Sequence, residues 1–222
     1  EALEALGSMP ASSGIGDALL DLLSERDANV RAAAFLALAQ LDAEAFVSAI
    51  AGLEPDKDWT VRAAQAEAIG RLPAERALTA LMGRLNDPDQ RVVAPVLKAL
   101  AATGSPEALT ALLAGLKAED LVVRAEAARG LGAIKAASAA RALAEAVEAW
   151  KGDPQYVARV AALEALARID PAAAAPILRA ALGDRDWAVR VRVAELLAGP
   201  SPTGGSAEPS PDVASAIRPA PS

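Results

Sequence analysis

The sequence of 222 residues contains no histidine and no cysteine. These absences exclude a zinc site built from His and Cys ligands, a thiolate nucleophile, a disulfide and a histidine-based catalytic triad. The sequence also shows no glycine-rich phosphate loop and no nucleophile placed beside a base. Any chemistry would rest on carboxylates, Lys, Arg, Ser or Thr, and we expect no metal and no cofactor.

Aromatic residues make up only 3% of the chain, although 53% of it is hydrophobic. Alanine and leucine supply most of the apolar content, and both are strong helix formers, so the composition favours an all-α fold. No run of about 18 apolar residues occurs, so we expect no membrane span. The net charge of −7 disfavours a nucleic-acid partner, which usually requires a basic face. No targeting segment is visible, and the compartment stays open.

Two similar hexapeptides, KDWTVR at 57–62 and RDWAVR at 185–190, belong to a longer repeat. We take the valine of each hexapeptide as the reference position. It recurs at steps of 31, 31, 31, 35 and 31 residues, at Val30, Val61, Val92, Val123, Ala158 and Val189. Three residues before it stands an Asp in five copies, and one residue after it stands an Arg in five copies. Eight residues after it, all six copies have Leu or Ile.

Each copy predicts a pair of helices. The second helix begins at the Asp, which is a good N-cap, and its apolar residues at positions 0, +4, +7, +8 and +11 form one helix face. The first helix is shorter, and Pro73, Pro106 and Pro171 lie at or near the starts of three first helices, where proline is tolerated. Neither helix can bury its apolar face alone, so neighbouring copies must stack.

This pattern, Asp-x-x-Val-Arg-x-x-Ala-x-x-Ala-Leu-Gly-x-Leu, resembles the HEAT repeat in its short bacterial form, which is also found in phycobilin lyases. The resemblance covers roughly residues 1–199. It implies an all-α fold, a right-handed α-α superhelix of about six helix pairs. It says little about activity, because the family includes scaffolds, adaptors and a few enzymes.

The predicted domain organisation follows from the repeat. A partial repeat occupies residues 1–10, and the remaining units of the solenoid span about 15–41, 43–72, 73–103, 105–135, 138–169 and 171–199. Residues 200–222 contain six of the 15 prolines and few apolar residues, so they predict a flexible linker or disordered tail.

The repeated Asp and Arg residues admit two interpretations. They could form a binding surface that runs across the repeats. Alternatively, each Asp caps its helix and each Arg pairs with an Asp or a carbonyl of an adjacent unit. We favour the second interpretation, in which KDWTVR joins two repeats and is not a catalytic site.

Other residues are candidates for binding a protein. Trp59, Tyr156 and Trp187 stand two residues before the reference position, where they would either form a rim that grips a partner or fill gaps between repeats. Trp150 lies in the longest repeat, and we expect its loop to project it into solvent. The solvent positions of the second helices, which we expect to line a concave face, hold Glu67, Arg71, Lys98, Glu126, Arg129, Glu164, Arg168, Arg192 and Glu195. These charges are either solvated decoration or contacts to a protein, which a mixed-sign surface suits better than phosphates.

The leading hypothesis is a non-catalytic, monomeric scaffold that binds another protein or peptide along the concave face. The alternative is an accessory region of a multidomain enzyme. The closing residues DVASAIRPAP, at 212–221, resemble the approach to a cyclophilin-type prolyl isomerase domain, which would follow residue 222. A bilin-lyase-like role is a weaker alternative that rests on the repeat type alone.

Overall fold

The computed structural model describes residues 14–199, and this part of the chain contains helices and no strand. The partial repeat predicted at 1–10 and the linker predicted at 200–222 lie outside the described residues. The α-helices are α2 (Ile15–Leu22), α3 (Ala28–Leu41), α4 (Ala43–Gly52), α5 (Trp59–Ile69), α6 (Ala74–Met82), α7 (Gln90–Thr103), α8 (Pro106–Gly115), α9 (Leu121–Ala133), α10 (Ala140–Ala149), α11 (Val157–Ile169), α12 (Pro171–Ala181) and α13 (Trp187–Ala198). Two short 3-10 turns, η1 (Ala137–Ala139) and η2 (Trp150–Gly152), flank α10.

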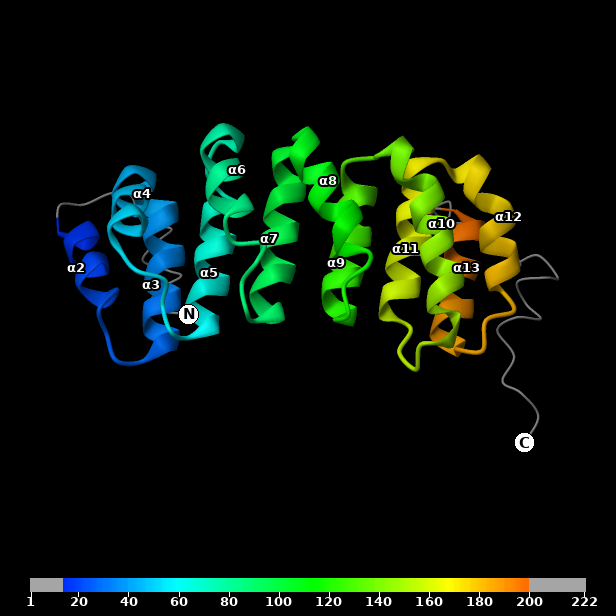
Figure 1. Cartoon of the computed structure of the whole chain (residues 1–222), viewed down its shortest axis with the longest axis horizontal. Coiled ribbons are helices and arrows are strands. Elements are labelled where there is room, and N and C mark those ends of the chain that lie inside the picture. The colour runs from blue at the N-terminus through cyan, green and yellow to red at the C-terminus, as the bar shows by residue number, and fades with distance from the viewer. Residues whose placement is uncertain (1–13, 200–222) are drawn as a thin grey trace, which may run out of the picture. The chain divides into compact units, whose positions relative to one another are not determined.

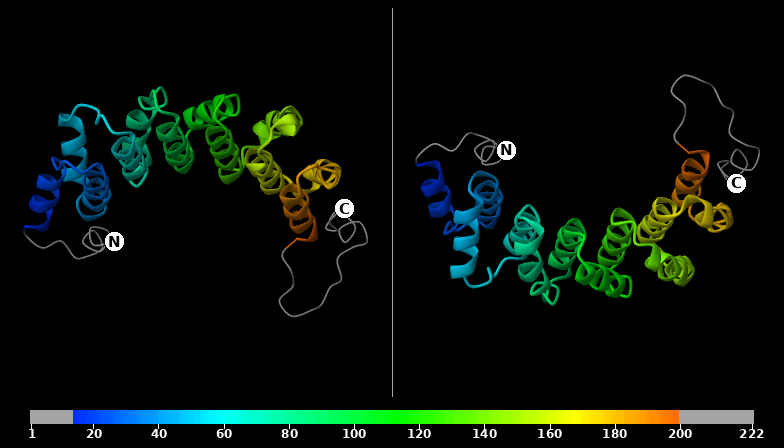
Figure 2. Two further views of the ribbon diagram at one scale, coloured as in Figure 1. Left: turned by 90° about the horizontal axis from the view of Figure 1, so that it is seen from below. Right: turned by 90° about the horizontal axis from the view of Figure 1, so that it is seen from above.

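The chain divides into two compact units, Glu1–Ala111 and Leu112–Ser222, and the division falls within α8. In unit 1 the second helices α3, α5 and α7 pack in sequence, and the first helices α4 and α6 lie on one side of them (Figures 1 and 2). In unit 2 the second helices α9, α11 and α13 pack in the same way, with α10 and α12 against α11 and α13. The helices therefore alternate as the predicted pairs.

The buried residues of the second helices follow the predicted repeat. At the reference position Val61, Val92 and Val189 have no exposed surface, and Val30 in the first repeat is half-buried. Eight residues later, Leu38, Ile69 and three further leucines are at most 4% exposed. Burial of these side chains against the neighbouring repeats supplies most of the favourable free energy of folding.

Each second helix that has the Asp three residues before the reference position begins as expected. The side chains of Asp27, Asp58, Asp89, Asp120 and Asp186 each accept a hydrogen bond from the backbone N–H two residues further on. The fifth repeat has Gln155 instead, and α11 has no side-chain cap at its N-cap residue Tyr156. Pro73 caps α6, and Pro106 and Pro171 open α8 and α12, as the sequence predicts.

Small residues allow consecutive second helices to approach closely. A Cβ atom on Gly132 of α9 would lie 2.7 Å from the Cα and 2.9 Å from the Cβ of Ala165 in α11. In unit 1, a Cβ atom on Gly70 would lie 2.7 Å from the Cβ of Ala99. The glycine at this position is therefore a packing requirement in both units, although glycine costs helix stability.

We predict that Gly132→Ala destabilises unit 2. Alanine raises the helix propensity of α9 by about 1 kcal/mol, but its Cβ meets helix backbone that cannot rotate away, and overpacking of this kind costs about 1–3 kcal/mol. The control is Gly16→Ala in α2, where a Cβ meets nothing within 4 Å. Thermal unfolding should show a lower Tm for Gly132→Ala and an unchanged or higher Tm for Gly16→Ala. Equal melting of the two variants would contradict the close approach of α9 and α11.

Candidate protein-binding surfaces

The Arg that follows the reference position joins consecutive repeats through an Asp that lies 25 residues further on. Arg62 donates from Nε to Asp87 at 2.7 Å and from Nη2 to the other carboxylate oxygen at 2.9 Å. Arg31 pairs with Asp56 at the same distances, and Arg159 pairs with Asp184 at 3.1 and 3.2 Å. We call each such pair an Arg–Asp joint.

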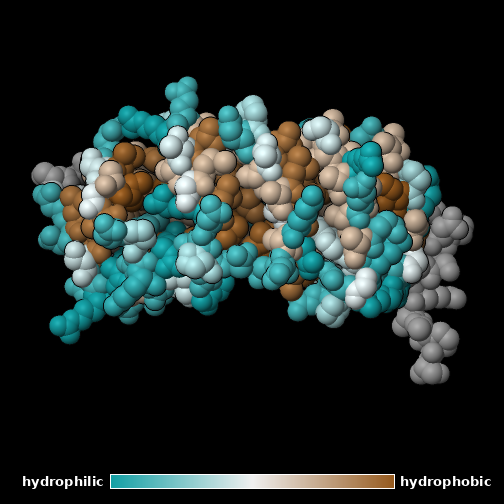
Figure 3. All heavy atoms as spheres, viewed as in Figure 1, coloured by the Kyte–Doolittle hydropathy of each residue, from teal (hydrophilic) through white to brown (hydrophobic). Residues whose placement is uncertain are grey.

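The third guanidinium nitrogen of each of these arginines bonds to backbone carbonyls in the turn before its own helix. Nη1 of Arg62 donates to the carbonyls of Asp56 and Lys57 at 2.7 and 3.1 Å. The joint Asp also accepts the backbone N–H of the capping Asp two residues later, as Asp87 does from Asp89 at 2.9 Å. One carboxylate thus connects the Arg of one repeat to the helix start of the next. Hydrophilic residues accordingly gather along the edge of unit 1 where α3 and α5 begin (Figure 3).

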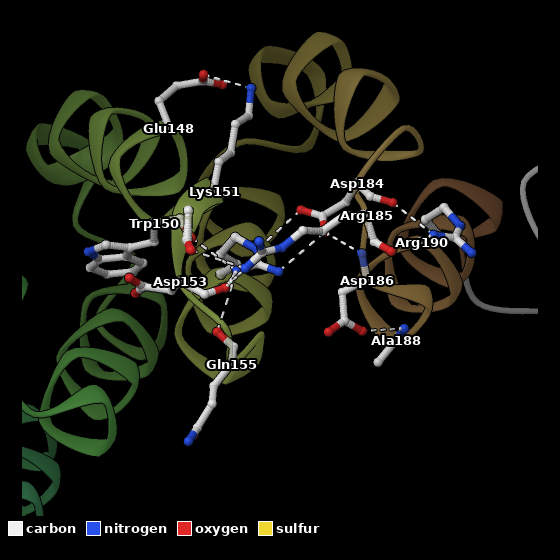
Figure 4. Close-up of polar contacts among 12 residues, drawn as sticks. Glu148, Trp150, Lys151, Asp153, Gln155, Asp184, Arg185, Asp186, Ala188 and Arg190 are labelled. Carbon is white, nitrogen blue, oxygen red and sulfur yellow. Dashed lines mark hydrogen bonds and ion pairs between the residues drawn. The ribbon is translucent and has the colours of Figure 1, made fainter.

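The joint between the fourth and fifth repeats is weaker. These repeats are separated by 35 residues, and Arg124 makes a single hydrogen bond to Asp153 at 2.8 Å. Its Nε is buried and has no hydrogen-bond partner, the one such side-chain atom among the described residues. In the next joint, Arg159 is fully buried and donates to the carbonyls of Trp150 and Asp153, both at 3.0 Å (Figure 4).

The Arg–Asp joints lower the pKa of their carboxyl groups. The hydrogen bond from Arg62 lowers the pKa of Asp87 and outweighs burial, which raises it. Burial raises the pKa of Asp56, but the hydrogen bonds from Arg31 and from the Asp58 N–H bring it below its ordinary value. Both carboxyl groups are therefore held in the charged form. These contacts confirm the structural interpretation of the repeated Asp and Arg residues.

The charged candidates on the second helices are all exposed or half-buried. Several of them neutralise one another: Arg71, which follows α5, pairs with Glu67 of α5 at 3.1 Å, and Arg129 pairs with Glu126 at 3.1 Å on α9. Arg192 of α13 bridges Glu164 of α11 at 2.5 Å and Glu195 of its own helix at 2.7 Å. Lys98 and Arg168 form no ion pair with another described residue.

The three aromatic candidates at equivalent positions have different surroundings. Trp59 is half-buried, and the guanidinium of Arg91, from the next repeat, lies 4.0 Å from the centroid of its ring. Tyr156 is 40% exposed and Trp187 is 55% exposed. The residue equivalent to Arg91 after Tyr156 is Ala188, which is too short to cover a ring. The rings of Tyr156 and Trp187 in unit 2 are therefore exposed, whereas Arg91 covers the ring of Trp59 in unit 1.

The prediction that Trp150 is exposed was wrong, because this residue is only 5% exposed. The turn η2 continues from the end of α10 and places the indole inside unit 2. Its backbone carbonyl accepts a hydrogen bond from Arg159, and the Arg124 guanidinium lies 5.3 Å from its ring centroid. The four extra residues of this repeat bury Trp150, so it offers no surface to a partner.

Val122, which was not predicted from the sequence as a binding residue, is 53% exposed at the start of α9. Together with Tyr156 and Trp187 it gives each of the three second helices of unit 2 an exposed apolar side chain near its N-terminus. We call Val122, Tyr156 and Trp187 the apolar row. The signal was present in the sequence, because the equivalent positions in the first three repeats hold Asn29, Thr60 and Arg91.

Two further observations concern residues 14–199. No group of three or more Asp or Glu residues is arranged to hold a metal ion in that range. None of the helices there has the length and apolar character that a membrane span requires.

Comparison with known proteins identifies the repeat. A family model for HEAT repeats matches residues 16–94, 46–132 and 84–151, which together span more than half of the chain. The chain belongs to the HEAT-repeat family. No curated protein matches it. HEAT-repeat solenoids commonly act as protein-interaction scaffolds, whereas the family as a whole does not fix an activity.

Solved structures support the same fold. Two crystal structures of engineered proteins from the Northeast Structural Genomics Consortium each match with a TM-score of 0.51. The first is 23% identical, and the match covers 97% of this chain and 65% of that chain. The second is 21% identical, with 90% of this chain and 97% of that chain covered. This HEAT-repeat chain therefore spans about two thirds of the length of the first engineered protein.

We predict that breaking one Arg–Asp joint destabilises unit 1 strongly. In Arg62→Gln the Asp87 carboxylate, whose side chain is 8% exposed, loses its counter-ion, and breaking a buried pair costs about 3 kcal/mol. The matched control is Arg141→Gln, which breaks an exposed pair with Glu145 and should cost less than about 1 kcal/mol. Urea unfolding measures both. Equal free energies of unfolding for the two variants would show that the joint contributes no more than a surface ion pair.

The joints also predict how stability depends on pH. A carboxyl group whose pKa is lower in the folded chain stabilises the fold above the unfolded pKa of about 3.9, and this contribution is lost as the pH falls below it. The pKa of Asp87 is lowered, so the difference in unfolding free energy between wild type and Asp87→Asn should be largest above about pH 5. It should shrink as the pH falls to about 2. A difference that stays constant over this range would contradict the charged state of Asp87.

Proposed function

We propose that this HEAT-repeat protein is a non-catalytic scaffold that binds another protein along the face formed by its second helices. The observation that carries the proposal is the apolar row of unit 2. Tyr and Trp are the side chains that most often anchor a protein interface, and here both are exposed at the starts of consecutive second helices. Nothing in residues 14–199 covers Trp187 as Arg91 covers Trp59.

The second helices of unit 2 place the members of the apolar row at the N-terminal ends of neighbouring helices. α9 packs against α11 and α11 against α13, and each begins at its exposed residue or beside it. Neighbouring helix axes lie about 8–10 Å apart, so the row extends about 20 Å along one edge of the unit. A partner of suitable chemistry presents apolar side chains at this spacing and both signs of charge around them. The opposite charges of Glu126 and Arg129, on the same helix as Val122, fit the polar rim of such an interface.

The enzyme alternatives have no observation in their favour among the described residues. The prediction of a prolyl isomerase domain after residue 222 concerns residues beyond the chain described and stays a prediction. The prediction of a bilin-lyase-like role stays one too, as does the prediction of a monomer.

We predict that the apolar row is required for partner capture. The full chain, immobilised, should retain one or a few proteins from a lysate of its source organism, and Tyr156→Ser combined with Trp187→Ser should reduce their recovery about tenfold or more, because anchor residues contribute over 1 kcal/mol each. The control Leu20→Ser replaces an exposed apolar residue of α2, outside the row, and should leave recovery unchanged.

The substituted residues are exposed, so both variants should unfold at nearly the wild-type temperature. Recovery of the same proteins by the double variant would show that the row is not the binding surface. Capture of no protein above the background of the uncoupled resin would contradict the scaffold function itself.

A further inference from the structure

A second surface of interest is a pocket of about 700 Å³ in unit 1. It is formed by the end of α4, the middle of α5, the end of α6 and the turns that follow α4 and α6. All of its lining residues lie between Ile50 and Pro88, so it is separate from the apolar row of unit 2. Two of these residues depart from the repeat in a way that packing does not explain.

The first departure is Gln65 of α5. It is 5% exposed, and its carboxamide makes no hydrogen bond to any residue that the structure describes. In the other repeats, the position four residues after the reference position holds a buried apolar side chain: Ala34, Val96, Ala127, Ala162 and Val193. The carboxamide atoms of Gln65 are not sealed from solvent, so they reach the pocket that the residue lines. Because Gln65 lines the pocket, a ligand there can supply the missing partner.

The second departure is Arg84, one turn before the joint residue Asp87. The equivalent position in the other 31-residue repeats holds Leu22, Leu53, Gly115 or Ala181. Arg84 is half-buried and donates one hydrogen bond, from Nη1 to the carbonyl of Ala80 at 2.9 Å, and no carboxylate of the described residues pairs with it. Burial lowers the pKa of Arg84, and the charge of Asp87 opposes that shift. The guanidinium is thus partly desolvated and retains free N–H donors.

The other charges of the pocket are already neutralised for the most part. Asp56 and Asp87 belong to Arg–Asp joints with Arg31 and Arg62. Glu54 and Lys57, in the turn after α4, carry opposite charges. Arg84 therefore remains as the positive charge without a counter-ion.

Apolar residues also line the pocket. Ile50 and Leu53 belong to the end of α4, and Leu53 is 49% exposed. The pocket thus combines an arginine fork, a carboxamide and an apolar surface within one volume, as sites for small polar-apolar ligands do.

We propose that this pocket binds a peptide carboxylate that lies next to an apolar side chain. Arg84 receives the carboxylate, which matches the planar guanidinium fork. Gln65 bonds to the adjoining peptide group with its amide, and Ile50 and Leu53 contact the apolar side chain. A phosphate fits less well, because it carries nearly two negative charges and three carboxylates line the same pocket.

The test is a titration of the full chain followed by ¹H–¹⁵N NMR at the Arg84 Nε–H and the Gln65 side-chain amide. The first probe is acetyl-Gly-Ala-Leu with a free C-terminal carboxylate, and the second is its C-terminal amide. The third is acetyl-Gly-Leu-Glu amide, whose carboxylate is in a side chain, and the fourth is inorganic phosphate. We expect the first or third probe to shift both signals with a Kd of about 0.1–10 mM, and the amide without a carboxylate to bind at least tenfold more weakly.

The relative affinities of the first and third probes distinguish a chain terminus from an acidic side chain, and either result supports the proposal. Equal binding of the uncharged amide overturns it, as does tighter binding of phosphate. The absence of any shift at both signals up to about 10 mM peptide overturns it as well.

Two variants restore the residue that the repeat has elsewhere, so they should fold. Arg84→Leu and Gln65→Val should each weaken peptide binding about tenfold or more, while their Tm stays equal to or above that of the wild type. Arg141→Leu removes an exposed positive charge from unit 2 and should bind the peptide as the wild type does. Unchanged affinity in Arg84→Leu and Gln65→Val would overturn the assignment of these two residues. This outcome does not depend on whether the apolar row binds a partner.

Discussion

The arginine that follows the reference position in five of the six repeats imposes the strictest geometric requirement on the repeats. Apolar burial favours stacking of the helix pairs, but it does not fix one register, because it has no direction. The Arg62 guanidinium does have a direction: two of its nitrogens face Asp87 and the third faces two carbonyls of its own turn. A shift of one repeat against the next would leave a buried charge without its partner, which is costly. The joint therefore specifies how the apolar faces meet.

Departures from the joint show where this requirement is relaxed. The longer fifth repeat leaves Arg124 with one hydrogen bond and an unpaired Nε, and the indole of Trp150 lies beside its guanidinium. In the third repeat, Val93 replaces the arginine, and Ala118 stands 25 residues later where the other joints of 31-residue steps have an Asp. Both partners have been replaced together, which avoids an unpaired charge. The division between the two compact units falls between these two positions in the sequence.

The repeat period made the helices, the caps and the Arg–Asp interpretation predictable, because six copies of the pattern serve as their own comparison. Exposure was harder to predict. Trp59 and Trp187 occupy the same position, yet a single residue of the following repeat, Arg91, decides that the first is covered. Trp150 was misjudged because a loop insertion indicates extra residues and not the direction in which their side chains point. The pocket could not be predicted from residues that recur, because Gln65 and Arg84 differ from their counterparts in the other repeats.

When a position in a repeat protein holds an apolar residue in every other copy, packing alone favours an apolar residue there. Gln65 places an amide where the other repeats have a buried valine or alanine, and Arg84 places a partly desolvated charge where two other repeats have leucine. Each residue puts a polar group where the other repeats pack an apolar one or glycine, and the two line one pocket. The opposite departure occurs in the apolar row, where Val122, Tyr156 and Trp187 expose apolar surface to water. Packing of the repeats explains neither the polar residues of the pocket nor the exposed apolar row, so function is the better explanation of both. The two surfaces lie in different units and have different chemistry.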